Sequence, residues 1–325
     1  MADTPLAAVV MAGGLGTRMK SALPKHFHEI LGRRMVDWII ETGRVAGAQP
    51  LVVIASPTTR DEFASSGVEV AVQETPLGTG DAVRSARAAL EAHDGDILVL
   101  SGDTPLLTVA LLRDLVAAHH REGADATILS AEPDDPRLYG RVVRDRNGAV
   151  RKVVEGTDAS DEERKIREIN SSIYVFRSSA LWPALERLQP KNVQGELYLT
   201  DAIEIIAAAG KVAAHVAADS RETDGVNTRV ELAHAGAVLR DRINEAHMLA
   251  GVTIVDPKTT WIEPTVEIDA DVTIHPFTSL RGLTKIATGA EIGANTVAID
   301  AHIGRKATIG PFCYLRPGTV LGESS

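Results

Sequence analysis

The chain has 325 residues, a formal net charge of −10 and one cysteine. This length suits two domains, and the negative charge argues against nucleic acid or an anionic membrane as the main partner, since both favour a basic surface. The lone Cys313 excludes an internal disulfide, and the sequence has neither a secretory signal nor a long apolar run, so we expect a cytoplasmic protein.

The first stretch that carries chemistry runs from Val9 to Met19. It joins a predicted strand to a turn with three glycines, whose backbone can bring N–H groups close to an anion: Gly13, Gly14 and Gly16. Arg18 adds a planar guanidinium, and Lys25 follows within a few residues. The glycine spacing matches neither the dinucleotide-binding fingerprint nor the P-loop. Positive charge gathered here in an acidic chain favours a phosphate site over an ordinary turn.

Up to about Val216, short apolar runs alternate with helical patterns, as in the βα units of a parallel sheet. The expected strands are Ala7–Met11, Leu51–Ala55, Val68–Val72, Ile97–Leu100 and Ala126–Ala131. The expected helices are Met35–Ala46, Thr58–Ser65, Thr79–Ala92 and Val109–His120. An antiparallel insertion with an Asn147-Gly148 turn is predicted from three further strands: Gly140–Val143, Val150–Val154 and Ile169–Phe176. The fold class is therefore expected to be α/β, with a Rossmann-like mixed, mostly parallel sheet.

After residue 227 the pattern changes twice. Residues 228–250 read as a long helix, for which Asn227 could be the N-cap. From Ile262 onward aliphatic residues recur every six positions, with a one-residue slip near Ala298 and a small or β-branched residue two positions before each. This repeat predicts a parallel β-helix of roughly three coils, of unspecified handedness, in which Cys313 fills a tight corner. We expect three parts: residues 1–227, a linker helix over 228–251 and a partial β-helix over 252–325.

Asp103 follows the predicted strand Ile97–Leu100, at the edge where open α/β sheets bind ligands. Next to phosphates, a carboxylate can hold Mg²⁺, which takes one or two protein oxygens together with substrate oxygens. The alternative is an aspartate that caps a turn before Thr104 and Pro105. The phosphate turn predicted nearby favours the metal role.

Two weaker clusters could contact the organic parts of a ligand. The segment from Gln73 to Gly80 is a second glycine loop, whose side chains and N–H groups could read the edge of a base. On the antiparallel insertion, Gly140, Glu155 and Asn170 could face sugar hydroxyls, although each of them alone fits a solvated surface.

Together these stretches resemble the sugar nucleotidyltransferases, and among them the bifunctional bacterial N-acetylglucosamine-1-phosphate uridyltransferase and glucosamine-1-phosphate acetyltransferase family. The matching motifs run over nearly the whole chain: Met11–Met19, Leu23–Lys25, Pro76–Gly80, Gly102–Leu106, Tyr139–Arg141, Glu168–Asn170, Gln194–Asp201 and Gly225–Asn227. The resemblance implies a left-handed β-helix, a homotrimer, and Mg²⁺-dependent uridylyl transfer from UTP to N-acetylglucosamine-1-phosphate for peptidoglycan precursors.

The resemblance also implies a role for individual residues. Arg18 and Lys25 would be catalytic and face the phosphates. The nucleotide would contact Met11, Ala12, Gly13, Gly14, Lys25, Gln73, Gly78 and Thr79. The sugar phosphate would contact Ser101, Gly102, Asp103, Gly140, Glu155, Asn170 and Asn227. Asp103 and Asn227 would also hold Mg²⁺, which makes Asn227 a ligand rather than a helix cap.

The sequence departs from this family in places. Gly13 stands where the family usually has alanine, and Phe27 where it has an aliphatic residue. Of the acetyltransferase site only Arg316 matches, and the sequence ends soon after it, so we expect no acetyl transfer. Two rival interpretations stay open: synthesis of an ADP-glucose or dTDP-glucose type product, and a non-catalytic trimeric assembly module.

Overall fold

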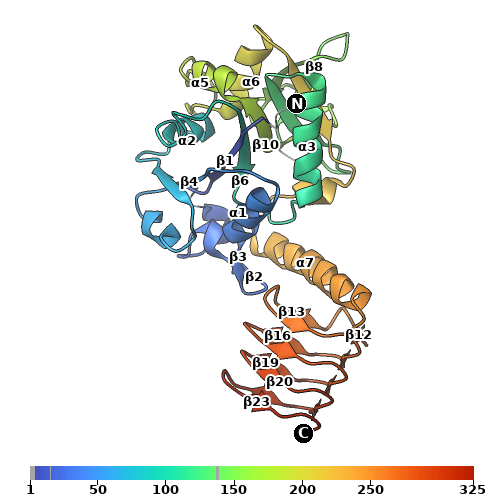
Figure 1. The fold of residues 1–325 in the computed structure, drawn as a ribbon. Helices are drawn as coiled ribbons and strands as arrows, with labels where there is room; N and C mark the ends of the chain where they lie inside the picture. The colour runs from blue at the N-terminus through green and yellow to red at the C-terminus, as the bar shows by residue number, and fades with distance from the viewer. Residues whose placement is uncertain (1–3, 15, 137–138) are drawn as a thin grey trace. The chain divides into compact units, whose positions relative to one another are not determined.

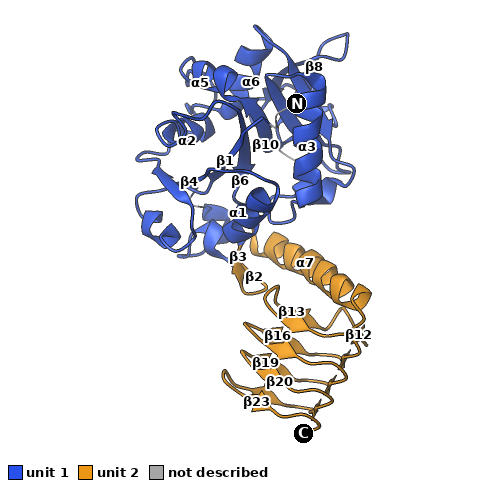
Figure 2. Ribbon diagram, in the orientation of Figure 1, with its two compact units in different colours: residues 1–28, 35–227 blue, residues 29–34, 228–325 orange. Residues whose placement is uncertain are grey.

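The computed structural model describes residues 4–14, 16–136 and 139–325. The described chain forms two compact units (Figure 2). Unit 1 comprises residues 1–28 and 35–227, and unit 2 comprises residues 29–34 and 228–325. The second unit is therefore discontinuous in sequence, because a short hairpin near the N-terminus belongs to it.

None of the helices among the described residues is long and apolar enough to cross a membrane.

Unit 1 is built on a sheet that has nine strands within the described residues (Figure 1). The strand order is β11-β7-β10-β6-β1-β4-β5, with the β8–β9 hairpin joined to β10. β1, β4, β5 and β6 run parallel, whereas β10 is antiparallel to both β6 and β7. The bounds are β1 Leu6–Met11, β4 Leu51–Ala55, β5 Glu69–Val72, β6 Asp96–Ser101, β7 Ala126–Ala131, β8 Arg141–Arg144, β9 Val150–Val154, β10 Ile169–Arg177 and β11 Val212–Val216. The expected mixed, mostly parallel sheet is confirmed.

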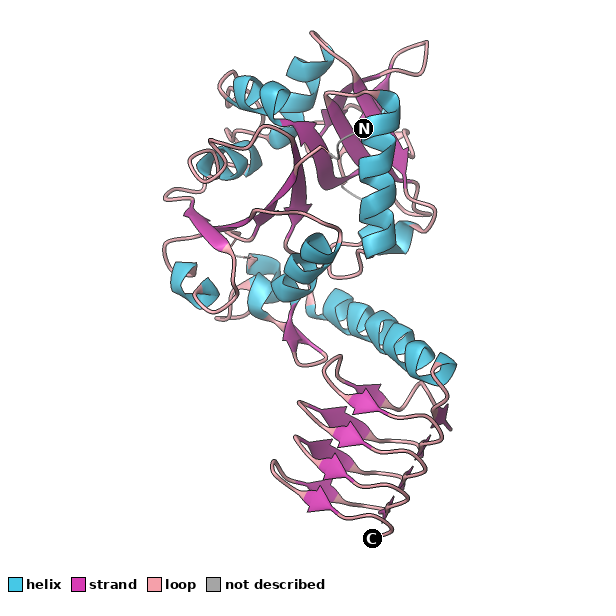
Figure 3. Cartoon of the chain, in the orientation of Figure 1, coloured by secondary structure: helices cyan, strands magenta, loops and turns pink. Residues whose placement is uncertain are grey.

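Helices cover both faces of this sheet (Figure 3). Successive strand residues point to opposite faces, so Val9 packs with α2, α5 and α6, while Val10 packs with α1 and α3. The helix bounds are α1 Met35–Val45, α2 Thr79–Ser85, α3 Val109–Glu122, α4 Asp161–Arg164, α5 Ser178–Leu185 and α6 Leu199–Ala207. The short 3₁₀ turns are η1 Thr17–Met19, η2 Lys25–Phe27, η3 Arg60–Phe63 and η4 Ser220–Thr223. Because helices pack against both faces of the sheet, a ligand can reach the strands only at the sheet's edge.

Two of the expected helices are wrong in extent. The segment expected as a helix over Thr58–Ser65 contains only the 3₁₀ turn η3, in which Phe63 is the one buried apolar side chain. The helix expected over Thr79–Ala92 ends at Ser85, after which the backbone closes 3₁₀-type bonds such as Ala86 N–H to Val83 O at 3.1 Å. At η3 the segment offers no apolar stripe to pack. After Ser85, by contrast, Ala86 and Leu90 are buried although the α-helix has ended.

Unit 2 begins with the hairpin of β2 (Glu29–Ile30) and β3 (Arg33–Arg34) and the helix α7 (Arg229–Leu249). Thr228, not Asn227, is the N-cap of α7, and its side chain forms a capping box with Glu231. The alternative that made Asn227 the cap is therefore wrong. Asn244 on α7 donates from its side chain to the carbonyl oxygens of Pro257 and Thr260, which anchors the loop that enters the repeats.

The repeats form a parallel β-helix of three four-stranded sheets, all within residues that the structure describes (Figure 1). The strands are β12 Thr253–Ile254, β13 Trp261–Ile262, β14 Glu267–Ile268, β15 Thr273–Ile274, β16 Ser279–Arg281, β17 Lys285–Ile286, β18 Glu291–Ile292, β19 Val297–Ile299, β20 His302–Ile303, β21 Thr308–Ile309, β22 Tyr314–Leu315 and β23 Val320–Leu321. These strand sets are consistent with the left-handed form.

The β-helix has four coils over residues 253–321, all described, rather than the expected three. The first strand, β12, lies outside the expected repeat because eight positions separate Ile254 from Ile262. Ala298 fills a fully buried inward position, after which the turn at Asp300 is one residue short. Small side chains two positions before the aliphatic ones are buried as expected, for example Thr260 at 0% exposure, whereas Cys313 is only partly buried.

Candidate active site

The glycine turn continues from the carboxyl end of β1. Ala12 stays attached to the sheet, because its N–H donates to the Ile54 carbonyl at 2.9 Å. Gly16 has φ +64°, and a Cβ on it would lie 2.3 Å from Lys25 Cβ, so only glycine fits there. Leu15 lies outside the described residues. The chain then turns through η1 and η2 and brings Lys25 back beside the glycines.

Four of the expected site residues meet at one point. The Lys25 ammonium forms an ion pair with Asp103 and donates to Asn227 Oδ1 at 3.1 Å. Arg18 donates to the same Asn227 oxygen at 2.8 Å. Val226 N–H donates to the Asp103 main-chain carbonyl at 2.8 Å, which ties the segment before α7 to the turn after β6. Two cations, a carboxylate and an amide thus converge from distant parts of unit 1.

The surroundings of Asp103 hold it in the ionised state. Burial raises the pKa of its carboxyl, but the Lys25 ammonium and the hydroxyl of Ser101 outweigh burial and hold that pKa below its usual range. Ser101 Oγ donates to Asp103 Oδ1 at 2.6 Å. Next to it, Gly102 N–H donates to the Met11 carbonyl at 3.0 Å, and a Cβ on Gly102 would lie 2.8 Å from that oxygen. The carboxylate is therefore charged and fixed against the end of β1.

The donor set at this point suits a hard divalent cation. One carboxylate oxygen of Asp103 and the amide oxygen of Asn227 both lie within hydrogen-bonding reach of a single positive atom, Lys25 Nζ. Carboxylate and amide oxygens are ligands that Mg²⁺ accepts. Among the described residues no group of three or more histidine, cysteine or acidic side chains could hold a metal ion. A cation here would therefore need oxygens from a bound substrate, as a phosphate supplies.

Gln73 forms a second centre, directly after β5. Its Nε2 donates to the Gly78 carbonyl at 3.0 Å and to Asp81 Oδ2 at 2.9 Å. Both partners can only accept, so they fix the orientation of the amide and leave its Oε1 as the acceptor for a ligand. Oε1 lies 3.7 Å from where a Cβ on Gly13 would be, which places it beside the glycine turn. The Gln73 side chain therefore presents an acceptor, not a donor, to a ligand.

Thr79 and Gly78 shape the same loop. Thr79 Oγ1 accepts a hydrogen bond from Leu199 N–H at 3.0 Å, at the start of α6. Gly78 has φ +115°, and a Cβ on it would lie 2.6 Å from the Leu197 carbonyl oxygen. Gly78 is therefore needed for the close approach of two backbone segments.

Gly140, Glu155 and Asn170 also meet, on the antiparallel insertion. Asn170 N–H donates to the Gly140 carbonyl at 2.9 Å, and a Cβ on Gly140 would lie 3.4 Å from Glu155 Oε2. Thr200 donates to Glu155 Oε1 at 3.0 Å, and burial raises the pKa of the Glu155 carboxyl. The Asn170 amide donates to the hydroxyl oxygen of Tyr174 at 2.7 Å. These three are partly or fully buried and hydrogen-bonded, not solvated surface residues.

The three centres share one edge of the sheet. Gly13, Gln73 and Asp103 follow β1, β5 and β6, which run parallel, and Asn170 begins β10, which runs antiparallel to β6. The carboxyl ends of parallel strands are where open α/β sheets bind ligands.

Sequence reasoning missed three residues of these centres. Asp81 orients Gln73, and Thr200 bonds Glu155, although Thr200 lies in the Gln194–Asp201 motif. His26, between Lys25 and Phe27, is buried beneath the glycine turn. Only the motif around Thr200 offered a sequence signal.

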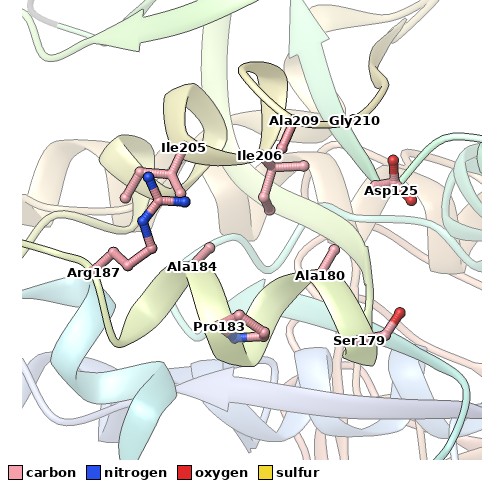
Figure 4. A pocket seen from close by; sticks show the side chains of 10 residues that line it. All are labelled: Asp125, Ser179, Ala180, Pro183, Ala184, Arg187, Ile205, Ile206, Ala209 and Gly210. Carbon is pink, nitrogen blue, oxygen red and sulfur yellow. The ribbon is translucent and has the colours of Figure 1, made fainter.

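A separate hollow of about 310 Å³ lies between α5 and α6, away from these centres (Figure 4). Ala184 and Ile206 form its apolar floor, with Arg187 at one end and Asp125 at the other. Asp125 is bonded to Arg177 at 3.2 Å and to Lys211 N–H at 2.9 Å. The hollow therefore presents an apolar wall next to a carboxylate that is already hydrogen-bonded, which does not resemble a phosphate site.

Comparison with known proteins agrees with this architecture. Residues 8–198 match the MobA-like NTP transferase domain family. The bifunctional protein GlmU of Streptomyces coelicolor is 45% identical over 99% of this chain and 72% of its own length. The GlmU proteins of Corynebacterium efficiens (45%) and Caldanaerobacter subterraneus (43%) match 98% and 97% of this chain, and 71% and 73% of their own lengths.

Proposed function

From the premise that this chain belongs to the family of bifunctional GlmU proteins, we propose that it is a UDP-N-acetylglucosamine pyrophosphorylase. It transfers a uridylyl group from UTP to N-acetylglucosamine-1-phosphate and releases pyrophosphate, for the synthesis of peptidoglycan precursors. The observation that carries this proposal is the convergence of Arg18, Lys25, Asp103 and Asn227 beside the glycine turn. The enzyme family depends on a metal ion, and we propose Mg²⁺.

The reaction joins two anions, so the site must offset their repulsion. A phosphate oxygen of the sugar-1-phosphate attacks the α-phosphorus of UTP in line, and the bond to pyrophosphate breaks. The attacking oxygen is already negative, and no general base is required. Arg18, Lys25 and the N–H groups of the glycine turn stabilise the charge that builds on the phosphates. Bound at Asp103 and Asn227, Mg²⁺ would withdraw charge from the phosphate oxygens.

The base and the sugar are bound by the two other centres. Gln73 offers the oxygen Oε1, which matches the imide N–H of uracil, and Gly78 and Thr79 shape the loop around it. The backbone of Met11, Ala12, Gly13 and Gly14 lies against the nucleotide. The sugar phosphate is held by Ser101, Gly102, Asp103 and Asn227 at its phosphate end and by Gly140, Glu155 and Asn170 at its hydroxyl groups.

The two rival interpretations make different predictions in one substrate screen. Pyrophosphate release is measured with each of the four NTPs, paired with N-acetylglucosamine-1-phosphate or with glucose-1-phosphate, with and without Mg²⁺. The proposal requires UTP with N-acetylglucosamine-1-phosphate to be the best pair. A preference for ATP or dTTP with glucose-1-phosphate would indicate the ADP-glucose or dTDP-glucose type. An assembly module would release no pyrophosphate with any pair.

We also propose that the protein is a cytoplasmic homotrimer that assembles through residues 252–325, while residues 1–227 carry the catalysis and 228–251 link the two. The β-helix displays large apolar side chains that a partner would cover, among them Phe277 at 62%, Phe312 at 78% and Val320 at 73% exposure. Large apolar side chains left exposed in this way support an interface with further copies of the chain.

A further inference from the structure

A buried imidazole beneath the glycine turn has no role in the mechanism above. His26 is 4% exposed and lies in η2, directly after Lys25. Its ring contacts two turns of the site: a Cβ on Gly14 would lie 3.8 Å from His26 Cε1, and a Cβ on Gly102 would lie 3.1 Å from His26 Cδ2. The ring therefore fills the space between the glycine turn and the turn that carries Asp103.

The His26 ring is also hydrogen-bonded to the backbone of Ala12. The Ala12 N–H already donates to Ile54, so its carbonyl oxygen is the group that bonds the ring. A carbonyl can only accept, and one ring nitrogen must therefore carry a proton and donate it. His26 Nδ1 has no hydrogen-bond partner among the described residues, which makes Nε2 the donor.

The ring makes this contact without adding charge to the site. Burial lowers the pKa of His26 to about 4, against the attraction of Asp103 and with a smaller contribution from Lys25. At neutral pH the imidazole is uncharged, with a proton on Nε2 and a bare Nδ1. A charged imidazole would compete with Lys25 for Asp103, whereas a neutral ring can fix the backbone and leave that ion pair intact.

We propose that His26 is a positioning residue, which holds the Ala12–Gly14 backbone at a fixed distance from the Gly102–Asp103 turn. The distance between the phosphate-binding N–H groups and the Asp103 carboxylate is then fixed by the ring. The site therefore needs no rearrangement when charge develops on the phosphates. This inference rests on the proposed function, because the spacing matters only if both turns contact the same substrate.

The test compares two substitutions of His26 with a matched control. His26→Leu removes the bond to Ala12 and keeps a large apolar side chain, whereas His26→Gln keeps an N–H donor. His119→Leu is the control. His119 lies on α3, away from the site, and is equally buried, and its Nδ1 is hydrogen-bonded to Thr127 at 2.8 Å. The control therefore loses a comparable buried imidazole and its bond.

We expect His26→Leu to lower kcat/KM for UTP roughly 10–100-fold, the effect of a small displacement of binding groups. The affinity for UTP, measured by calorimetry without the sugar phosphate, weakens in parallel. His26→Gln recovers part of both, and His119→Leu lowers the melting temperature but leaves kcat/KM within about twofold of the wild type. On the unaltered protein, ¹⁵N NMR shows His26 protonated at Nε2 and bare at Nδ1.

Each contrary result has a distinct meaning. If His26→Leu melts earlier but keeps wild-type kcat/KM and UTP affinity, the role is structural and the inference is overturned. The opposite tautomer in the NMR spectrum would also overturn it, even if neither variant folds. If the unaltered protein releases no pyrophosphate with any substrate pair, the proposed function fails and the inference fails with it.

Discussion

The ammonium of Lys25 lies 3.1 Å from Oδ1 of Asn227, although 202 positions separate the two residues in the chain. The same ammonium forms an ion pair with Asp103, which lies 78 positions from Lys25 in the chain. The Lys25 ammonium thus contacts oxygens from two distant segments. Asp103 follows β6, and Asn227 precedes α7. Changes at this point should act on catalysis more than on folding.

Lys25→Ala removes the central cation. We expect turnover to fall by about 10²–10³, the size of losing one preorganised group that stabilises developing charge. Pyrophosphate release measures the effect. Lys165→Ala is the control, because Lys165 is the C-cap of the short helix α4, is 69% exposed and pairs with Glu162. A near-normal rate for Lys25→Ala would remove this residue from the mechanism.

Asp103→Asn keeps the shape of the side chain but removes its charge. The Mg²⁺ concentration that gives half-maximal activity should rise at least about tenfold, because the proposed metal site would lose the carboxylate ligand that Asp103 supplies. Titration of activity with Mg²⁺ measures the shift. Asp161→Asn, at a carboxylate that is 95% exposed, is expected to change nothing. An unaltered Mg²⁺ dependence in Asp103→Asn would place the metal elsewhere.

Glu155→Gln separates stability from sugar binding. Burial raises the pKa of Glu155, so its contribution to stability is fully present below the unfolded pKa and is lost as pH rises through the folded pKa. An ionised carboxylate is therefore costly at this buried position, and the neutral amide should leave the melting temperature equal or higher. The KM for the sugar phosphate should rise roughly tenfold through a lost charged hydrogen bond. A lower melting temperature with an unchanged KM would contradict this role.

Asp96 offers a prediction about stability alone. It is buried at the amino end of β6, where it contacts His120 Nε2 at 2.6 Å and His119 Nε2 at 3.4 Å. Burial raises the pKa of Asp96, but the two histidine side chains outweigh burial and lower that pKa. The resulting stability is present above the unfolded pKa and is lost as pH falls through the folded pKa.

Asp96→Asn should therefore lower the free energy of unfolding by about 1–3 kcal/mol at neutral pH. Urea unfolding from about pH 7 to about pH 3 measures it, and the difference from the wild type should shrink as Asp96 becomes protonated. The kinetic constants should stay unchanged, because Asp103 lies beyond the opposite end of the strand. A difference that grows toward acid pH would show that the sign is wrong.

Phe312→Asp tests the trimer. Phe312 is 78% exposed on the β-helix, and a carboxylate there should shift the protein from three chains to one in sedimentation. Val230→Asp is the control, since Val230 is 80% exposed on α7 and lies outside the proposed interface. If the wild type sediments as a single chain, the trimer proposal is wrong.

Most of the fold could be predicted from the sequence where periodicity is strong. The buried strands and the six-residue repeat were found because alternate or inward positions must be apolar. The prediction failed where tertiary packing decides, as in the 3₁₀ turn at Arg60–Phe63 and the early end of α2. It also missed β12, the first strand of the β-helix, because the loop after Ile254 breaks the period.

The site residues could be predicted as types but not as partners. Glycines, cations and a carboxylate after strands indicated phosphate chemistry, and the structure brings Arg18, Lys25, Asp103 and Asn227 together. The sequence could not show that Asp81 fixes the Gln73 amide or that His26 supports the glycine turn. Those contacts depend on how separate loops meet at the sheet edge, and no local pattern encodes that.

The hairpin of residues 29–34 makes unit 2 discontinuous, and this limits how the two halves can be exchanged between homologous genes. Within unit 2, Ile30 is 3% exposed, and a Cβ on Gly236 of α7 would lie 3.7 Å from Ile30 Cγ2. A chimera with one crossover at residue 227 would combine a hairpin from one parent with α7 from the other. Successful recombination should therefore require both segments to come from the same parent.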